Sequence, residues 1–299
     1  MPHKYRSTSS PQLCGDVKLS IKEKIRYIWI NYKNNKSNLC ALDERIIFKK
    51  FSPKIRTNQI SQVGNIPPSP SRYLSNEFWR DCDLDFLLES NGPLRVLEVG
   101  CGTGIYGLEL QRKLGDKLKL YRGVDILRHS SWDDMPHNFE FYQAKAEDIA
   151  PYLTDIDLII TQSAIEHFEY DLSFFHQIVN YISNSNHIVW QIHLLPSAEC
   201  LKTYLWHGYR QYTYRNLSKI TKLFSDNSAI SVYCLGGKYA NKLHLWMITL
   251  PNFLLRVDLR ALFPRWYWRM LINSISKDLT HQQTASSFYG LMIKSEKTS

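Results

Sequence analysis

A β-type run that ends in a glycine-rich turn and leads directly into a helical pattern constrains this chain more than any other feature. Residues 94–99 read Leu-Arg-Val-Leu-Glu-Val, and glycine follows at positions 100, 102 and 104. Glycine lets the backbone adopt positive φ and approach a ligand closely. The first amide groups of the following helix face the same place. The segment therefore predicts one strand–turn–helix unit of a parallel sheet, with a ligand at the turn.

From residue 73 onward, short β-rich runs alternate with helical patterns, which is typical of a parallel sheet covered by helices on both faces. The predicted helices are at about 75–90, 104–115, 147–153 and 171–183. The predicted strands are at 94–99, 119–125, 138–143, 155–161, 187–193, 230–235 and 287–294. The fold class is therefore α/β, with a seven-stranded, mostly parallel sheet.

A cluster of proline and serine at 67–71 divides the chain, because repeated prolines favour extended backbone and remove hydrogen-bond donors. We expect residues 1–72 to form an N-terminal extension and residues 73–299 to form the main domain. Within that domain we expect an aromatic insert at 197–225 and a mostly helical insert at 237–280, before the last strand.

The positive charge lies in the N-terminal segment. Residues 1–60 hold 13 Lys and Arg against 4 Asp and Glu, whereas the remaining residues hold 24 against 24. The charge therefore gives no reason to expect nucleic-acid binding by the whole chain. Ile21, Ile25, Ile28 and Trp29 recur at helical spacing. They predict an amphipathic helix that either docks on the main domain or contacts an anionic surface such as a membrane.

Other features favour a cytoplasmic protein. The six cysteines are scattered and lack the spacing of metal ligands, so we expect reduced thiols and no metal site. The first 30 residues lack the apolar core of a signal peptide, and no later window reads as a membrane span.

Four motifs in sequence order resemble those of the class I S-adenosylmethionine-dependent methyltransferases. Glu98 and the glycines at 100, 102 and 104 match the acidic residue and G-x-G-x-G that end the family's first strand. Asp125 ends the second strand, and Ala-Glu-Asp-Ile at 146–149 follows the third. The Ser-x-x-Glu-His pattern at 163–167 follows the fourth. The resemblance covers residues 94–193 and continues more loosely to the end of the chain.

The resemblance implies a Rossmann-like fold, S-adenosylmethionine as the cofactor, and methyl transfer as the reaction. Asp125 would accept hydrogen bonds from the ribose hydroxyls, and Glu98 would lie at the methionine end. The usual adenine-contacting Asp aligns with Lys145, which leaves Glu147 or Asp148 as substitutes. The cofactor contacts implied in this way are Glu98, Gly100, Cys101, Gly102, Gly104, Asp125, Ile126, Ala146, Glu147 and Gln162.

A second glycine pattern overlaps the first. Residues 102–107 satisfy G-x-G-x-x-G, which is typical of NAD and FAD sites. The apolar run ends at Val99, so the first glycine of this pattern falls two residues too late. The dinucleotide interpretation is therefore disfavoured.

Three histidines are candidates for a general base that takes a proton from the acceptor: His193, His207 and His167. His167 follows the fourth strand, and His193 is expected to end the fifth at the carboxyl edge, where ligands of open α/β sheets bind. His207 lies in the segment 204–215, which holds five aromatic rings. Aromatic faces beside polar groups such as Tyr209, Arg210 and Tyr212 suit a small-molecule or glycan-linked acceptor, and the favoured acceptor atom is oxygen. The alternative is that this segment is structural.

Residues 243–269 combine four arginines with Trp246, Trp266, Tyr267 and Trp268. This composition predicts a lid or core element, a peripheral membrane contact, or a partner-binding surface.

Two other functions remain open. An RNA methyltransferase would use the basic N-terminal segment to follow phosphates, but Gln-Ser-Ala-Ile at 162–165 replaces the Asn/Asp-Pro-Pro-Tyr tetrad of the nucleic-acid amino-methylases. A nucleic-acid partner is therefore disfavoured. The second alternative is a non-catalytic module that retains the fold and binds a partner or a membrane. The oligomeric state is not predicted by the sequence.

Overall fold

The computed structural model describes residues 20–36, 40–55, 66–200, 203, 208–281 and 285–296. In these ranges eight strands form one sheet in the order β1-β7-β8-β6-β5-β2-β3-β4. The strands are β1 (Ile46–Lys50), β2 (Leu94–Val99), β3 (Leu118–Asp125), β4 (Phe139–Gln143), β5 (Leu158–Gln162), β6 (Val189–Pro196), β7 (Ala229–Leu235) and β8 (Phe288–Ser295).

Strand β8 runs antiparallel to its neighbours β6 and β7, and the other neighbouring strands are parallel. The carboxyl ends of β2, β3, β5, β6 and β7 therefore lie at one end of the sheet. The glycine turn, the segment after β6 and the helices after β7 all begin there.

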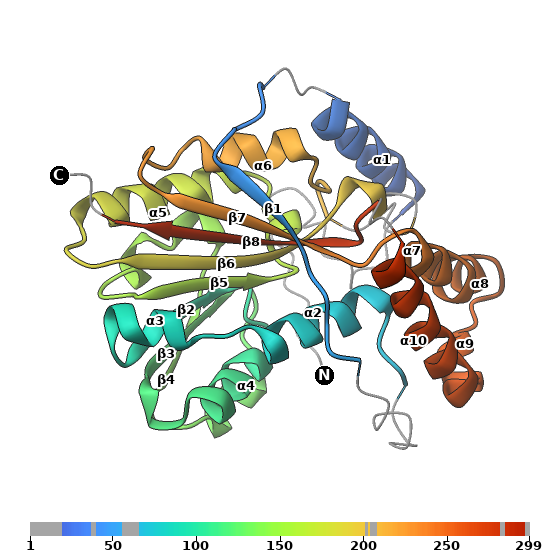
Figure 1. Cartoon of the computed structure of the whole chain (residues 1–299), viewed down its shortest axis with the longest axis horizontal. Coiled ribbons are helices and arrows are strands. Elements are labelled where there is room, and N and C mark those ends of the chain that lie inside the picture. The colour runs from blue at the N-terminus through green and yellow to red at the C-terminus, as the bar shows by residue number, and fades with distance from the viewer. Residues whose placement is uncertain are drawn as a thin grey trace.

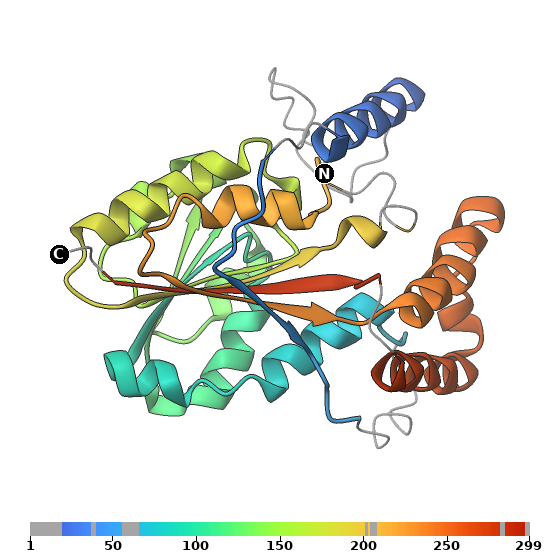
Figure 2. The same ribbon diagram turned by 45° about the horizontal axis from the view of Figure 1, so that its top comes forward.

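The helices of the described ranges cover both faces of the sheet (Figure 1). They are α1 (Ile21–Lys36), α2 (Pro70–Asp81), α3 (Asp85–Asn91), α4 (Ile105–Leu114), α5 (Asp171–Asn184), α6 (Tyr214–Thr221), α7 (Lys238–His244), α8 (Leu250–Leu255), α9 (Leu259–Leu262) and α10 (Pro264–Thr280). Helices α5 and α6 lie on one face, and α2, α3 and α4 lie on the other. Helices α7–α10 project beyond the carboxyl end of β7, and α1 lies toward the same end of the molecule (Figures 1 and 2).

Each face of the sheet has its own hydrophobic core. On one face Phe174, Phe175 and Ile178 of α5 pack with Leu217 of α6 against the strands. On the other face the core joins the apolar sides of α2, α3, α4 and α10 to the strands; it includes Leu74, Phe78, Leu87, Leu110 and Leu271. Burial of both faces explains why the central strands read as continuous apolar runs.

The predicted mostly parallel α/β sheet is confirmed, and all seven predicted strands are present. The additional strand is β1, which pairs in parallel with β7 and lies inside the segment expected to be an extension. Its residues are exposed except for Ile46, because β1 is an edge strand. An edge strand of this kind lacks the alternation from which strands are recognised.

Two predicted helices differ from those observed. The run 75–90 is two helices, and the first begins at Pro70, where Ser69 accepts a hydrogen bond from the backbone N–H of Arg72. The predicted helix 147–153 is two short 3-10 turns, Ala146–Asp148 and Ala150–Tyr152. Pro151 lacks the N–H that a continuous helix needs there. The predicted helical insert is confirmed and comprises α7, a π-helical turn at Leu245–Thr249, and α8–α10.

Candidate functional site

The glycine turn after β2 has the backbone geometry that its sequence predicts. Gly100, Gly102 and Gly104 have φ values of 78°, 50° and 79°. A Cβ atom on Gly100 would lie 2.4 Å from the Cβ of Ala164, so this glycine is needed for packing against the segment after β5. A Cβ atom on Gly102 would meet nothing within 4 Å. The front of the turn is therefore open at Gly102, where a ligand can approach the backbone.

Asp125, the last residue of β3, is tied to this turn. Its Oδ2 accepts a hydrogen bond from the Gly102 N–H at 2.8 Å, and its Oδ1 accepts one from the Leu127 N–H at 3.0 Å. A carboxylate has about four acceptor positions, so both oxygens can still accept from a ligand's hydroxyl groups. The half-buried Asp125 is therefore placed to hold a diol against the turn.

Glu98 lies beneath the turn and is 1% exposed. The Tyr121 hydroxyl donates to its Oε2. Burial raises the pKa of Glu98 to about 8, the Tyr121 hydrogen bond opposes this shift, and the negative charge of Asp125 adds to it. Within the described ranges Glu98 Oε1 has no hydrogen-bond partner. Buried polar atoms are nearly always paired, so this oxygen marks a place where a donor belongs.

Gln162 ends β5, the strand that pairs with β2. Its Oε1 accepts a hydrogen bond from the indole Nε1 of Trp79 in α2 at 2.6 Å. This bond fixes the orientation of the amide, and the Nε2 donor of the same amide is buried without a partner among the described residues. The neighbouring strands β2 and β5 thus offer one unpaired acceptor, on Glu98, and one unpaired donor, on Gln162.

The remaining predicted cofactor residues lie around the same edge. Cys101 is buried, its N–H donates to Val124 O at 3.2 Å, and burial raises the pKa of its thiol. Ala146 is buried, and its carbonyl accepts a hydrogen bond from Gln177 at 3.2 Å. The half-buried Ile126 and Glu147 follow β3 and β4 respectively, and Lys145 is exposed.

Several side chains that support this site were not predicted. Trp132 stacks on Phe141 with ring centroids 5.0 Å apart, and its indole donates to Gly102 O at 2.8 Å. Trp79 and Tyr121 orient Gln162 and Glu98. These residues come from α2, β3 and the 3-10 turn Ser130–Asp134. None of them is among the predicted site residues, and only the assembled fold identifies their role.

His193 is a core residue in this structure. Strand β6 continues to Pro196, so His193 lies inside the strand and not at its end. Its Nδ1 shares a hydrogen bond with Thr161 Oγ1 at 3.0 Å, and Phe174 and Phe175 pack edge-on against its ring. Burial lowers its pKa to about 3. The expectation that His193 contacts an acceptor does not agree with this fully buried position.

The other two histidines are differently placed. His167 is half-buried in the 3-10 turn Ile165–His167, directly after β5. It follows Glu166, a fully buried residue whose pKa burial raises to about 8. His207 lies outside the described residues, as do Tyr204, Leu205 and Trp206.

The aromatic segment after β6 uses its predicted polar groups for structure. Gly208 lies against Glu166, and the Tyr209 N–H donates to Glu166 O at 2.6 Å. Arg210 donates to the carbonyl of Phe168 at 2.7 Å and pairs with Asp171 at 3.0 Å. The buried Tyr212 hydroxyl donates to the same Asp171 at 3.0 Å. Arg210 and Tyr212 therefore anchor the segment to the start of α5 and do not line an open acceptor pocket.

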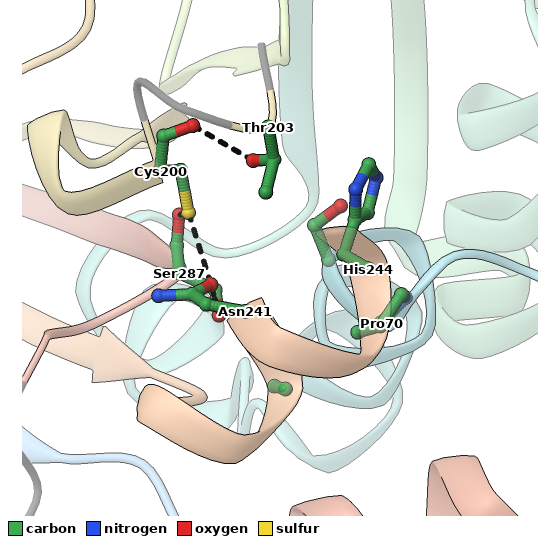
Figure 3. Close-up of a pocket in the computed structure, with 8 residues that line it drawn as sticks. Pro70, Cys200, Thr203, Asn241, His244 and Ser287 are labelled. Carbon is green, nitrogen blue, oxygen red and sulfur yellow. Dashed lines mark hydrogen bonds between the residues drawn. The ribbon is translucent and has the colours of Figure 1, made fainter. Parts of the chain in front are cut away.

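A separate small surface pocket lies between the start of α2, the segment after β6, and α7 (Figure 3). Cys200 Sγ donates to Asn241 Oδ1 at 3.1 Å, and the Ser287 hydroxyl donates to the same oxygen at 2.6 Å. The Thr203 hydroxyl donates to Cys200 O at 2.7 Å. The lining residues thus bond mainly with one another, and none is a predicted site residue. The described ranges also contain no group of three or more His, Cys, Asp or Glu placed to hold a metal.

The strand order with β8 reversed, the glycine turn after β2 and the acid at the end of β3 define a class I, Rossmann-like methyltransferase. A family model described as a methyltransferase domain matches residues 72–286, which is most of the chain. The chain belongs to this methyltransferase family. The prediction of an S-adenosylmethionine-dependent methyltransferase is thereby confirmed at the level of the family.

Individual relatives are more distant. Malonyl-[acyl-carrier protein] O-methyltransferase of Haemophilus influenzae is 33% identical over 79 residues, which cover 26% of this chain and 30% of the relative. The match therefore spans less than a third of that relative's length. A SAM-dependent methyltransferase from Archaeoglobus fulgidus has 18% identity and a TM-score of 0.44 over 75% of this chain and 94% of its own. The plantazolicin methyltransferase BamL, solved with SAH, has 14% identity and a TM-score of 0.40 over 92% and 90%.

Proposed function

We propose that this protein transfers the methyl group of S-adenosylmethionine to a hydroxyl oxygen of a small-molecule or glycan-linked acceptor. The observation that carries the cofactor assignment is the pair of buried, unpaired polar atoms beside the open glycine turn, Glu98 Oε1 and Gln162 Nε2. An amino-acid group supplies both missing partners, because its ammonium donates hydrogen bonds and its carboxylate accepts them. The methionine end of the cofactor is such a group.

Different site residues contact different parts of the cofactor. Asp125 accepts hydrogen bonds from the ribose hydroxyls, and the backbone at Gly102 permits close contact. Glu98 accepts from the ammonium, and Gln162 donates to the carboxylate. Ile126, Ala146 and Glu147 line the adenine side. S-adenosylmethionine supplies an electrophilic methyl group on a sulfonium. The protein's main contribution to the reaction is then the alignment of an acceptor oxygen with that methyl group.

We place the acceptor at the carboxyl ends of β5 and β6. A hydroxyl acceptor must lose a proton, and His167 is the described histidine at that edge that is not buried in the core. We therefore propose His167 as the general base, and His207 remains the alternative. A general base typically contributes 10² to 10⁴ in rate, or about 3 to 5 kcal/mol of the barrier.

Two features favour O-methylation of a small-molecule or glycan-linked acceptor over methylation of a nucleic-acid amino group. The Haemophilus influenzae relative is an O-methyltransferase by name. The Asn/Asp-Pro-Pro-Tyr tetrad of nucleic-acid amino-methylases is absent from the segment after β5.

The test is to incubate the purified protein with methyl-labelled S-adenosylmethionine and three separate extracts: small metabolites, glycans and glycolipids, and RNA. We expect label in the first or second fraction, as an ether or ester of oxygen. Label confined to RNA would contradict the proposal. Absence of transfer to any fraction, together with normal cofactor binding, would favour a non-catalytic module.

The role of the base is tested on the labelled fraction. His167→Gln should reduce the single-turnover rate about 100-fold or more and leave cofactor affinity unchanged. His207→Gln is the matched comparison, because it tests the alternative with the same substitution. Unchanged rates and pH profiles in both variants would show that neither histidine takes the proton.

A further inference from the structure

The helical insert exposes large apolar side chains that a globular protein normally buries. Each is between 52% and 71% exposed. We call this set the insert patch: Trp246, Phe253, Leu254, Leu255, Leu262, Phe263 and Trp266. It spans the π-helical turn, α8, α9 and the start of α10. Concentrated exposed apolar surface on a folded protein generally marks an interaction site.

Basic side chains accompany the insert patch. Residues 243–270 contain four arginines and one aspartate, a net charge of +3. The aspartate, Asp258, is paired with Arg260 at 2.8 Å. Arg256, Arg265 and Arg269 are exposed and form no ion pair within the described part of the chain. The surface is thus apolar and cationic together.

The insert patch lies at the end of the molecule where the parallel strands of the sheet terminate. Helix α7 begins three residues after β7 ends, so the insert extends from the carboxyl end of the parallel strands. Helix α1 contacts this end as well, because Asn31 Nδ2 donates to Gly208 O at 3.0 Å. Its Ile21, Ile25 and Trp29 are 77%, 63% and 64% exposed. Figures 1 and 2 show α1 and the insert toward the same end of the sheet.

We propose that the insert patch docks on an anionic phospholipid bilayer surface. The tryptophans, phenylalanines and leucines enter the interface between headgroups and acyl chains, and the three arginines face lipid phosphates. None of the helices in the described ranges has the length and apolar character of a membrane span.

Charge favours a lipid surface over two other binding partners of the insert patch, a second copy of the chain and residues 1–19. A second copy of the chain would bring the arginines of two identical patches together, and like charges across an interface are unfavourable. Residues 1–19 carry Lys4, Arg6 and Lys18 against Asp16, so this segment is also repelled. An anionic lipid surface is complementary to both the charge and the aromatic composition of the patch.

The test is co-sedimentation of the full chain with vesicles, which requires no knowledge of the acceptor. We expect binding to phosphatidylglycerol–phosphatidylcholine vesicles, weak binding to pure phosphatidylcholine, and release at high salt. The double variant Leu254→Asp/Leu255→Asp should reduce binding about tenfold or more. Arg265→Glu/Arg269→Glu should reduce it at least about fivefold for each arginine.

Matched controls separate the patch from general surface effects. Leu42 is an equally apolar side chain, 55% exposed and outside the insert, so Leu42→Asp should keep full binding. Lys119→Glu reverses an exposed charge on β3 and should have little effect. Circular dichroism establishes that each variant is folded.

Three results would overturn the proposal. The first is equal binding to charged and neutral vesicles. The second is full binding by both patch variants. The third is self-association through the patch in solution, abolished by Leu254→Asp/Leu255→Asp, with no vesicle binding by the wild-type chain. None of these depends on methyl transfer, so the proposed function can stand or fail separately.

Discussion

The two halves of the sheet differ in where their buried, unpaired polar atoms lie. In the half formed by β2–β5, the turn at Gly102 is open, and Glu98 and Gln162 keep buried atoms without partners among the described residues. In the half around β6, His193 and Arg210 bond within the fold, and the atoms that lack partners among the described residues, Trp190 Nε1 and Gln191 Nε2, lie within the strand. The first half therefore places its unpaired atoms beside the open turn, whereas the second places them inside the sheet and exposes large apolar side chains on the insert.

This contrast follows from what each half must recognise. A cofactor of fixed chemistry needs backbone geometry and a few buried polar atoms, which are set by short local motifs. We propose that the acceptor is bound near the carboxyl ends of β5 and β6, by a surface assembled from segments that are distant in the sequence. Their side chains carry no motif that states whether they bind a ligand or pack. Substitutions in the β2–β5 half should therefore change cofactor affinity. Substitutions in the core around β6 should change protein stability and leave cofactor affinity unchanged.

The largest effect on cofactor affinity is expected for Gly102→Val. A branched side chain would fill the open space before the turn, and φ of 50° is strained for valine. We expect affinity for S-adenosylhomocysteine to fall more than about 100-fold, equivalent to about 2.7 kcal/mol. The measurement is calorimetric titration.

Gly115→Val is the matched control for this variant. Gly115 has φ of 56° and open space around its Cβ position, but it ends α4 at the far end of that helix. It should also suffer backbone strain, because its φ is positive, and keep its cofactor affinity. Equal losses in both variants would mean that strain, and not ligand space, explains the result.

Asp125→Ala should have the next largest effect. It removes the acceptor of the ribose hydroxyls and also the bond that holds the Gly102 N–H. Hydrogen bonds to a charged group contribute about 1.5 to 3 kcal/mol, so affinity should fall about tenfold to 150-fold. Asp133→Ala removes an exposed carboxylate from the turn after the same strand and should change affinity little. Unchanged affinity in Asp125→Ala would exclude this residue from the site.

The pH dependence of binding should report on Glu98. Its pKa is about 8 in the free protein, so the carboxyl is mostly protonated below that pH. A ligand ammonium favours the ionised form, so binding releases a proton, and affinity should fall about tenfold per pH unit as the pH is lowered below 8. Above pH 8 this dependence should disappear.

Glu98→Gln should bind weakly and without this pH dependence, as titration calorimetry in buffers of different ionisation enthalpy would show. Glu166 is the other buried carboxyl with a pKa near 8 in this region. If the pH dependence of binding persists in Glu98→Gln and disappears in Glu166→Gln, the titrating group is Glu166 and not Glu98.

The smallest effect on cofactor affinity is expected for His193→Ala. It should leave affinity and the pH–rate profile unchanged and lower the free energy of unfolding by about 2 kcal/mol, because it opens a cavity and leaves Thr161 unpaired. Chemical denaturation measures this loss. A normal stability with a large loss of rate would restore His193 as a catalytic residue.

The sequence was most informative where local geometry alone determines the structure. The strand–turn–helix unit at the glycine turn and the strand ending at Asp125 follow from short segments, and the sequence predicts both. His193 was misplaced because β6 gains residues through pairing with β8, which lies about 100 residues later in the chain. Strand β1 was missed because it has one buried side chain.

The supporting residues could not be predicted for a similar reason. Trp79 reaches Gln162 across 83 residues of sequence, and Trp132 reaches Gly102 across 30. A buried tryptophan in an amphipathic helix or a short turn has the same local sequence pattern whether it orients a binding residue or fills the core. Only tertiary pairing distinguishes these roles.

The central claim is that the β2–β5 half binds S-adenosylmethionine. The most direct measurement is a thermal shift of the wild-type chain with S-adenosylhomocysteine, S-adenosylmethionine, NAD and FAD, each added separately. Either adenosyl compound, at 100 times its dissociation constant, should add about 2.7 kcal/mol to the free energy of unfolding, and the dinucleotides should add nothing. Stabilisation by NAD or FAD, with no response to either adenosyl compound, would contradict the account.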